Sequence, residues 1–167
     1  TNQTGIPIFS TAGCINNNCI NLTATNLAWN LTADTNNFDL KKGNKTLNLW
    51  FKSIDLSVNP YIIQKLGTTD FWSVDIFPTG EIEILRLCGS ITSAVAVNVN
   101  QWSMLTIAVN DTEVKLYINN TQIISCNLGT FGGVGNINIR FRSGTPGSNY
   151  KVLIDESGLR NRTLSTA

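Results

Sequence analysis

Four cysteines are the residues of this sequence whose chemistry is easiest to assign. Their even number, without the doubled C-x-x-C spacing of a zinc site, favours disulfides formed in an oxidising compartment. Cys14 and Cys19 flank a short turn, CINNN, so we expect them to pair with each other. Cys88 and Cys126 each follow a predicted strand, so we expect a long-range disulfide between them. The alternative pairing joins Cys14 to Cys88 or Cys126.

Asparagine side chains offer a second kind of chemistry, N-linked glycosylation at Asn-x-Thr. The sequence has 22 Asn and 19 Thr, which predict roughly 2.5 such motifs by chance. The predicted acceptors, seven in number, are Asn2, Asn21, Asn30, Asn44, Asn110, Asn119 and Asn161. This excess and the cysteines both indicate an exported, glycosylated protein. The alternative is that a surface rich in Asn and Thr creates these motifs without use.

Side chains suited to acid–base catalysis are scarce. Histidine is absent, which removes the commonest general base and rules out an ordinary Ser-His-Asp triad. In the alternating stretch 81–87, Glu81 and Glu83 share one face, but Leu85 takes the next position of that face. A solvated outer face of a strand is the expected role of the two glutamates. The adjacent Asp155 and Glu156 should point to opposite faces, so we predict no catalytic residue and no enzyme.

Composition limits the partners of the chain. The 167 residues are 42% hydrophobic and only 14% charged, with a net charge of +1 and no basic or acidic run. Long-range attraction to nucleic acid is therefore not indicated. No stretch approaches the 18 apolar residues of a membrane-spanning helix. The chain opens TNQTGIP without Met, which we interpret as a mature form that has lost its signal peptide.

The pattern of apolar residues predicts an all-β protein. The clearest segment is a hairpin, 101–124, in which every second residue is apolar on both sides of the polar pair Asn110-Asp111. The stretch 46–54 alternates as well, with Leu47, Leu49 and Phe51 on one face and Trp50 on the other. Further strands are predicted at 71–77, 81–87, 93–100, 136–141 and 151–160. Strands every 8 to 12 residues are typical of an antiparallel two-sheet sandwich.

A single domain is expected. We predict an extended N-terminal leader at residues 1–13 and one jelly-roll domain at residues 14–167. Ile6, Ile8 and Phe9 form the one apolar patch of the leader. Ile6 and Ile8 lie two apart, so an extended chain would present both on one side, as an added strand requires. Pro7 lies between them and cannot donate a ladder hydrogen bond, and the alternative is a free terminus or an ordinary edge strand.

Three segments resemble the laminin-G-like, concanavalin A-like jelly roll. They are TLNLWFK (46–52), QWSMLTIAV with VKLYINNTQI (101–123), and IDESGLRNRTLS (154–165). The family often has His after the indole, where Ser103 stands here, and favours Asp-Gly at the turn occupied by Asn119-Asn120. The resemblance covers most of the chain and implies an antiparallel jelly-roll fold. It also implies binding to glycans, proteins or calcium, because relatives with this fold do so.

The resemblance suggests several sites. Some relatives are glycoside hydrolases with a Glu-x-Asp-x-x-Glu strand, which the stretch from Glu81 does not complete. Relatives hold calcium at a loop rim, and the candidate ligands here are Asp70, Asp75, Asp111 and Asp155. No motif supports calcium, so we predict no cofactor and leave the metal ligands unknown. Tyr61, Phe71 and Trp72 could face a sugar, whereas core packing is the expectation for Trp50, Trp72 and Trp102.

Two functions follow. The composition also resembles that of the glycosylated, thread-like surface filaments of thermoacidophilic archaea, which assemble by donor-strand exchange. The first hypothesis is therefore an extracellular, N-glycosylated subunit of a cell-surface filament or coat, which polymerises with copies of itself through Ile6, Ile8 and Phe9. The alternative is a lectin-like module that binds a glycan or a protein through its loops.

Overall fold

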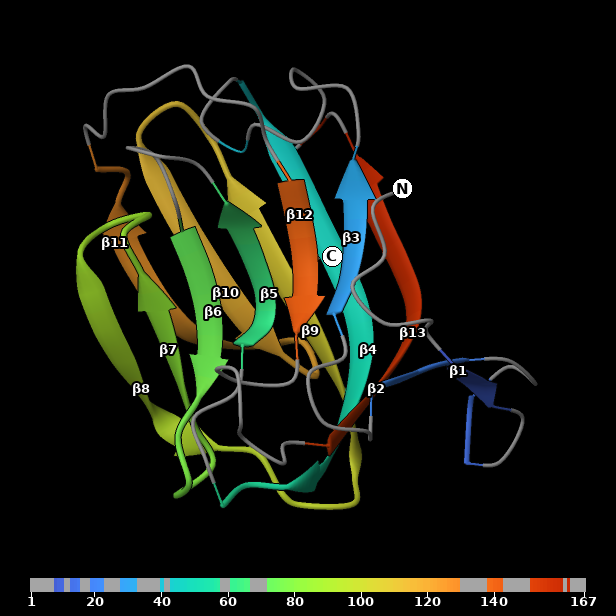
Figure 1. Cartoon of the computed structure of the whole chain (residues 1–167). Helices are drawn as coiled ribbons and strands as arrows, with labels where there is room; N and C mark the ends of the chain where they lie inside the picture. Colours follow the sequence, from blue (N-terminus) through green and yellow to red (C-terminus); the bar gives the residue numbers. More distant parts are fainter. Residues whose placement is uncertain are drawn as a thin grey trace.

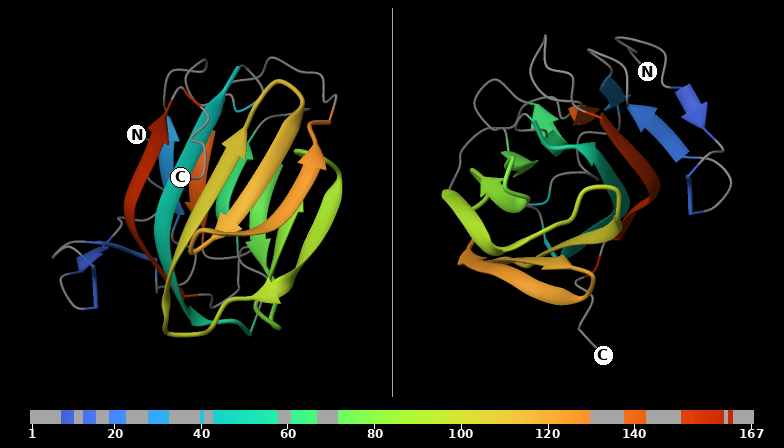
Figure 2. Two further views of the ribbon diagram at one scale, coloured as in Figure 1. Left: turned by 180° about the vertical axis from the view of Figure 1, so that it is seen from behind. Right: turned by 90° about the horizontal axis from the view of Figure 1, so that it is seen from below.

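The computed structural model of the chain describes residues 8–10, 13–15, 19–22, 28–32, 40, 43–57, 61–66, 72–129, 138–142, 151–160 and 162. Within these ranges the structure consists of strands and turns (Figure 1). The strands form two antiparallel sheets that pack face to face, as both turned views show (Figure 2). The predicted fold class, an antiparallel two-sheet jelly roll, is confirmed.

The larger sheet has seven strands. Their order across the sheet is β1 (Ile8–Ser10), β2 (Cys19–Leu22), β13 (Lys151–Arg160), β4 (Lys45–Asp55), β9 (Trp102–Val109), β10 (Glu113–Ile118) and β11 (Thr121–Asn127). The two long strands β13 and β4 pair at its centre, although they are far apart in the sequence. A register shift between Asp155 and Gly158 interrupts their ladder, and Glu156 within it has a φ of 44°. This β-bulge redirects the side chains on either side of it.

The smaller sheet has six strands. Their order is β3 (Ala28–Thr32), β12 (Asn138–Arg142), β5 (Tyr61–Leu66), β6 (Trp72–Ile76), β7 (Glu81–Leu85) and β8 (Ser90–Ala96). Strands β5 to β8 follow one another in the chain as a meander, whereas β3 and β12 come from distant parts of the sequence. The strands predicted at 71–77 and 81–87 are present in slightly shorter form. The strand predicted at 93–100 begins earlier, at Ser90, and ends at Ala96.

The hydrophobic core lies between the two sheets. Alternate residues of β4 are buried, which places Leu47, Leu49 and Phe51 in the core, as the sequence predicts. The opposite sheet contributes Trp72 and Ile82, which are also fully buried. Because successive residues of a strand point to opposite faces, the residues between these buried positions lie on the outer faces of the sandwich. Those outer faces carry the candidate sites.

The predicted hairpin is confirmed as β9 and β10. Val109 pairs with Val114, and Asn110 closes the turn because its Oδ1 accepts hydrogen bonds from the backbone N–H of Thr112 at 2.9 Å and of Glu113 at 2.6 Å. The next turn joins β10 to β11 through Asn119 and Asn120, whose φ angles are 49° and 67°. A two-residue turn with both φ angles positive is type I′, the type that matches the twist of a hairpin. Asparagine accepts this conformation better than other residues that have a side chain.

Both disulfides of the structure join the cysteines paired in the sequence prediction, Cys14 with Cys19 and Cys88 with Cys126. Cys88 lies in the turn between β7 and β8, and Cys126 lies in β11. Strands β8 and β11 are edge strands of different sheets. The Cys88–Cys126 disulfide therefore links the two sheets along one open side of the sandwich.

Part of the predicted leader is a strand in the structure. Residues 8–10 form β1, which pairs with β2 in the register Ile8↔Asn21, Phe9↔Ile20 and Ser10↔Cys19. Strand β1 lies at the edge of the larger sheet and is set apart from the body of the sandwich (Figure 1). Ile6 lies outside the described residues. The proposed boundary between leader and domain at residue 13 therefore stays a prediction.

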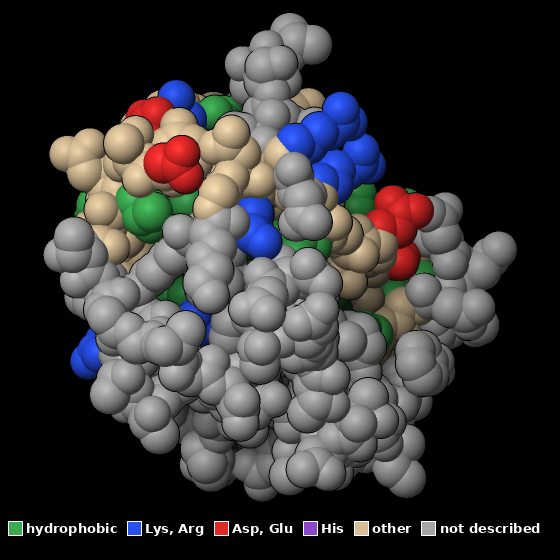
Figure 3. Space-filling view, turned by 90° about the horizontal axis from the view of Figure 1, so that it is seen from above, with side chains coloured by type: hydrophobic (Ala, Val, Ile, Leu, Met, Phe, Trp, Pro, Cys, Tyr) green, Lys and Arg blue, Asp and Glu red, His purple; other side chains and the backbone are tan. Residues whose placement is uncertain are grey.

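The rim at the upper end of the sandwich carries charges of both signs. Figure 3 shows Lys and Arg side chains gathered in one area, with Asp and Glu side chains on both sides of it. This mixture of signs agrees with the net charge of +1. In the part of the chain that the structure describes, no helix has the length and apolar character needed to cross a membrane.

Candidate functional site

Four large side chains lie together on the outer face of the seven-stranded sheet. Trp50 of β4, Trp102 and Met104 of β9, and Tyr117 of β10 are all partly exposed, and we call this group the aromatic face. Trp50 pairs with Met104, and the next pair on the same face is Lys52 with Trp102. Tyr117 pairs with Thr106 on the neighbouring strand. Directly paired side chains are about 5 Å apart and diagonal ones about 7 to 8 Å, so the four form one continuous surface.

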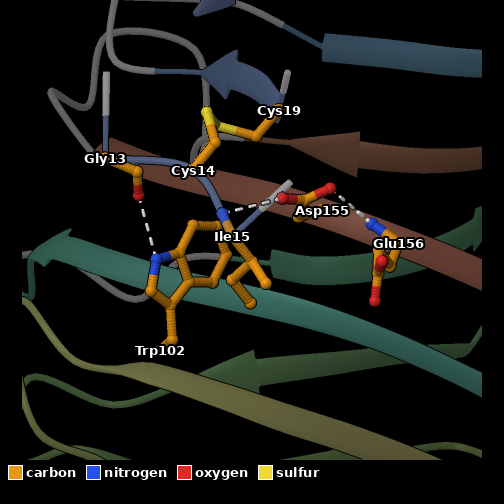
Figure 4. The surroundings of a disulfide bond; sticks show 7 residues. All are labelled: Gly13, Cys14, Ile15, Cys19, Trp102, Asp155 and Glu156. Carbon is orange, nitrogen blue, oxygen red and sulfur yellow. Dashed lines mark hydrogen bonds between the residues drawn. A yellow bond between two sulfur atoms is a disulfide. The ribbon is translucent and has the colours of Figure 1, made fainter. Parts of the chain in front are cut away.

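The disulfide loop borders the aromatic face. The Trp102 indole Nε1–H donates a hydrogen bond to the Gly13 carbonyl oxygen at 2.9 Å, and the Ile15 backbone N–H donates to Asp155 Oδ2 at 3.0 Å. Figure 4 shows the loop held between the indole and the carboxylate, next to the Cys14–Cys19 disulfide. These contacts place Ile15, which is 40% exposed, beside the rings as an additional apolar side chain.

Asp155 holds the loop and the bulge together. Its second oxygen, Oδ1, accepts a hydrogen bond from the backbone N–H of Glu156 at 2.9 Å, and the side chain is only 7% exposed (Figure 4). Asp155 is also paired with Trp50 across β13 and β4. A carboxylate whose two oxygens both accept backbone hydrogen bonds is already engaged structurally. Asp155 is thus a positioning residue for the loop, and its location fits a structural role better than a calcium ligand at the rim.

A polar border surrounds the aromatic face. Lys52 lies beside Trp102, and Lys115 lies on β10 two residues before Tyr117. Lys115 Nζ is 2.9 Å from Glu113 Oε2, and Ser125 Oγ donates to Glu113 Oε1 at 2.8 Å. The hydrogen bond from Lys115 lowers the pKa of Glu113 and raises that of Lys115. The face therefore combines ring surfaces with charged and hydrogen-bonding groups at its edge.

The outer face of the six-stranded sheet is different in character. Glu81 and Glu83 lie on it as predicted, and both are partly exposed. The register places Asp75 of β6 directly opposite Glu83. The pKa of Asp75 is raised to about 7, chiefly because the carboxyl is buried. The hydrogen bond with the Ser73 hydroxyl acts in the lowering direction, and the negative charge of Glu83 adds to the rise. The sequence alone did not bring Asp75 and Glu83 together, because it did not fix the register of β6 against β7.

The aromatic residues weighed from the sequence divide between the core and the surface. Trp72 is 1% exposed and packs in the core, as expected. The expectation of core packing is wrong for Trp50 and Trp102, because each lies at the outward positions of an alternating strand. Tyr61 is partly exposed on β5, and Phe71 lies outside the described residues. The alternation around Trp50 was the signal that could have identified the aromatic face.

The rim positions considered for calcium do not converge. Asp111 is exposed at the turn between β9 and β10. Asp155 lies on β13, and both of its oxygens already accept backbone hydrogen bonds. Asp75 lies on the other sheet, and Asp70 lies outside the described residues. Across the described ranges, no three His, Cys, Asp or Glu side chains form a group able to hold a metal ion.

The predicted glycosylation sites are spread over the chain. Asn44 and Asn119 are exposed, whereas Asn21 and Asn110 are partly buried. The Oδ1 atom of Asn119 accepts a hydrogen bond from the Met104 backbone N–H at 2.8 Å, which leaves its amide nitrogen for a glycan bond. Asn30 belongs to β3, where the structure describes the backbone. Asn2 and Asn161 lie outside the described residues.

Comparison with known proteins supports the fold. A family model described as the concanavalin A-like lectin/glucanases superfamily matches residues 28–167. No curated protein sequence matches the chain.

Similar solved structures include receptor-binding domains of botulinum neurotoxins. The domain of the C/D mosaic serotype has a TM-score of 0.75 at 20% identity and covers 98% of this chain and 43% of its own. The binding domain of neurotoxin DC in complex with rat synaptotagmin II has a TM-score of 0.74 at 14% identity, with 95% and 43% coverage. The type G domain has a TM-score of 0.70 at 19% identity, with 98% and 44% coverage. At these identities the likeness shows the shared fold, and the chain spans less than half of each of these structures.

Proposed function

The chain belongs to the concanavalin A-like lectin/glucanases superfamily, and we propose that it is an extracellular, non-catalytic module that binds a glycan through the aromatic face. The observation that supports this most is the clustering of three partly exposed rings and a methionine on one face of a well-packed sheet. Large apolar side chains that gather at a surface mark interaction sites more often than isolated ones do.

A sugar fits this surface chemically. Indole and phenol rings offer flat apolar surfaces, and their polar atoms remain able to hydrogen-bond. Lys52 and Thr106 lie on the same outer face as the rings, where the ammonium group can donate to hydroxyl groups and the threonine hydroxyl can donate or accept. Ligand sites usually combine an apolar lining with a few polar groups that fix the orientation of the ligand.

Binding is favoured over catalysis by the state of the acidic residues. Both oxygens of Asp155 accept backbone hydrogen bonds, so this carboxylate is committed to the fold. Asp75 and Glu83 lie opposite each other on β6 and β7, but the Oδ1 atom of Asp75 is shielded from solvent. A hydrolase needs two carboxylates that both reach the sugar bond.

Export and glycosylation belong to the same proposal. The two disulfides support an oxidising, extracellular location. We propose N-linked glycans on the predicted acceptors, with the exposed Asn44 and Asn119 the best placed of the described ones. No membrane span and no nucleic-acid partner are part of the proposal.

The test is glycan binding by variants of the aromatic face. Unglycosylated protein is screened on a glycan array, and the best ligand is then titrated calorimetrically. We expect Trp50→Ala to weaken binding by at least about fivefold, because base stacking on aromatic side chains shows that one ring contact contributes about 1 to 3 kcal/mol. Trp102→Phe keeps an aromatic ring at this position but makes it smaller and removes the hydrogen bond to Gly13. A control on the other sheet, Val95→Ser, alters an exposed apolar residue away from the face. Unchanged affinity of Trp50→Ala would exclude this site.

A second function is favoured by the position of β1. This strand has three residues, lies at a sheet edge and pairs only with β2 within the described part of the chain. We propose that the leader can also pair with β2 of another copy, which would make the protein a filament subunit assembled by strand exchange. Such a contact is head-to-tail and does not close, so repetition gives a filament.

Strand exchange predicts that the leader is needed for polymers and dispensable for folding. Deletion of residues 1–10, or replacement of both Ile6 and Ile8 by Asp, should leave a folded monomer that does not polymerise in size-exclusion chromatography or electron microscopy. Replacement of the exposed Ile15 by Asp is the matched control, since it changes an isoleucine outside the leader. A wild-type chain that stays monomeric at high concentration would contradict the filament hypothesis and leave glycan binding untouched.

A further inference from the structure

Asp75 is a buried acidic residue on the outer face of the six-stranded sheet. Trp72, Val74 and Ile76 of β6 belong to the core. The intervening side chain of Asp75 therefore points away from the core, yet the residue is only 9% exposed. Among the described residues, its Oδ1 atom has no hydrogen-bond partner and is shielded from solvent. A carboxyl in such surroundings is costly to charge, because burial removes the stabilisation that water gives to a carboxylate.

A second carboxyl group lies directly opposite. Strands β6 and β7 are neighbours in the sheet (Figure 1), and their register pairs Asp75 with Glu83. Glu83 is partly exposed, and its Oε1 atom accepts a hydrogen bond from Ser90 Oγ, which favours the charged form of Glu83. Directly paired side chains are about 5 Å apart, and like charges at such positions destabilise a sheet. A negative charge on Asp75 would therefore weaken the pairing of β6 with β7.

The other titratable residues near Asp75 do not offset this repulsion. On β5, Tyr61 is the register partner of Asp75, and Lys65 lies on the core side of that strand, opposite a core residue of β6. On β7, Glu81 lies on the same outer face and is acidic. Strand β8 adds no charged residue, and Arg142 of β12 pairs with Tyr61, two strands away from Asp75. Of the described side chains, the charged ones next to Asp75 on its own face are thus acidic.

Protonation of Asp75 relieves both costs. Its pKa is raised to about 7, chiefly by burial; the hydrogen bond with the Ser73 hydroxyl acts in the lowering direction, and the charge of Glu83 adds to the rise. The unfolded chain lacks these surroundings, and an aspartate in it has a pKa of about 3.9. Between these two pKa values the folded chain holds a proton that the unfolded chain has released. The contribution of Asp75 to stability therefore grows as the pH falls from about 7 to about 4, and it does not change above that range.

We propose that Asp75 and Glu83 form a pH-sensitive strand pair, in which proton uptake by Asp75 removes the repulsion between β6 and β7 and stabilises the six-stranded sheet. This strand pair lies on the opposite side of the sandwich from the aromatic face and does not depend on the proposed glycan binding. Asp55 and Glu113 act in the opposite sense, because hydrogen bonds lower the pKa of each. Their stabilising contributions are lost only in acid, below about pH 5.

The experiment measures thermal unfolding of the wild type and of Asp75→Asn at pH 5, 6, 7 and 8 at constant ionic strength. Asparagine has the shape of aspartate and stays neutral at each pH, so it stands in for the protonated carboxyl. From pH 5 to pH 8, the folding equilibrium constant of the wild type should fall roughly 10- to 100-fold relative to that of the variant. For a chain of this size, the Tm of the wild type should then fall by roughly 3 to 10 °C relative to the variant.

Glu81→Gln is the matched control. Glu81 lies two residues from Glu83 on the same face of β7, but its register partner is Ala96, and it accepts a hydrogen bond from Thr79 Oγ1 at 2.9 Å. This variant should keep the pH dependence of the wild type. Glu83→Gln should move the dependence to lower pH without abolishing it, because the facing charge is removed while Asp75 stays buried.

An NMR titration of the Asp75 carboxyl carbon in the wild type tests the same proposal without any substitution. The signal should titrate well above the ordinary range of aspartate, and the backbone amides of β6 and β7 should shift with it. A carboxyl that titrates near pH 4 would overturn the proposal. A difference in Tm between the wild type and Asp75→Asn that stays constant from pH 5 to pH 8 would overturn it as well.

Discussion

Removal of the two disulfides should cost different amounts of stability. The Cys88–Cys126 disulfide closes a loop with a sequence separation of 38, and the Cys14–Cys19 disulfide closes one of 5. In the chain-entropy model these loops correspond to about 4 and about 2 kcal/mol, because a longer cross-linked loop restricts the unfolded chain more. Replacing Cys88 and Cys126 together with Ala should therefore lower the free energy of unfolding by about 2 kcal/mol more than replacing Cys14 and Cys19.

Urea unfolding followed by circular dichroism under oxidising conditions gives both values. The two pairs lie in different parts of the fold, so the four-residue variant should lose roughly the sum, about 6 kcal/mol. Equal losses for the two pairs, or a larger loss for Cys14 and Cys19, would refute the reasoning. The second result would mean that the contacts of the loop with Trp102 and Asp155 contribute more to stability than the chain constraint does.

Further predictions concern glycans and glycines. Mass spectrometry of protein from a glycosylating host should find glycan on Asn44 and Asn119, since both side chains are exposed; bare asparagines there with other sites occupied would contradict this. Gly80→Ala should destabilise the protein more than Gly43→Ala. Both glycines have a positive φ, which costs alanine about 1 to 2 kcal/mol. A Cβ at Gly80 would also lie 2.5 Å from the Val97 carbonyl oxygen, whereas no atom of the described residues lies within 4 Å of a Cβ at Gly43. Equal unfolding midpoints for the two variants would show that the turn at Gly80 shifts freely.

Much of the fold could be predicted from periodicity. The alternation of Leu47, Leu49 and Phe51 identified a strand and its buried face, and the polar pair at Asn110 located the hairpin. The pairing of Cys88 with Cys126 followed from their places near strand ends. These features are local or depend on one pattern, so a single sequence contains them.

The candidate sites could not be predicted in the same way. The facing positions of Asp75 and Glu83 depend on which residue of β7 lies beside β6, and the register between strands is not written in the alternation of one strand. The positioning role of Asp155 depends on the bulge before Gly158 and on the return of the loop at Ile15 from the other end of the chain. Trp50 was misassigned although its face was correct, because large rings in sandwiches are usually buried.

The most direct test of glycan binding is an NMR titration of ¹⁵N-labelled, unglycosylated protein that follows the indole N–H signals. The aromatic face places Trp50 and Trp102 at the ligand and Trp72 in the core on the other sheet. Addition of the oligosaccharide selected on the array should shift the signals of Trp50 and Trp102 and leave that of Trp72 in place. Shifts confined to the six-stranded sheet, or binding without any change at Trp50 and Trp102, would contradict the proposed site.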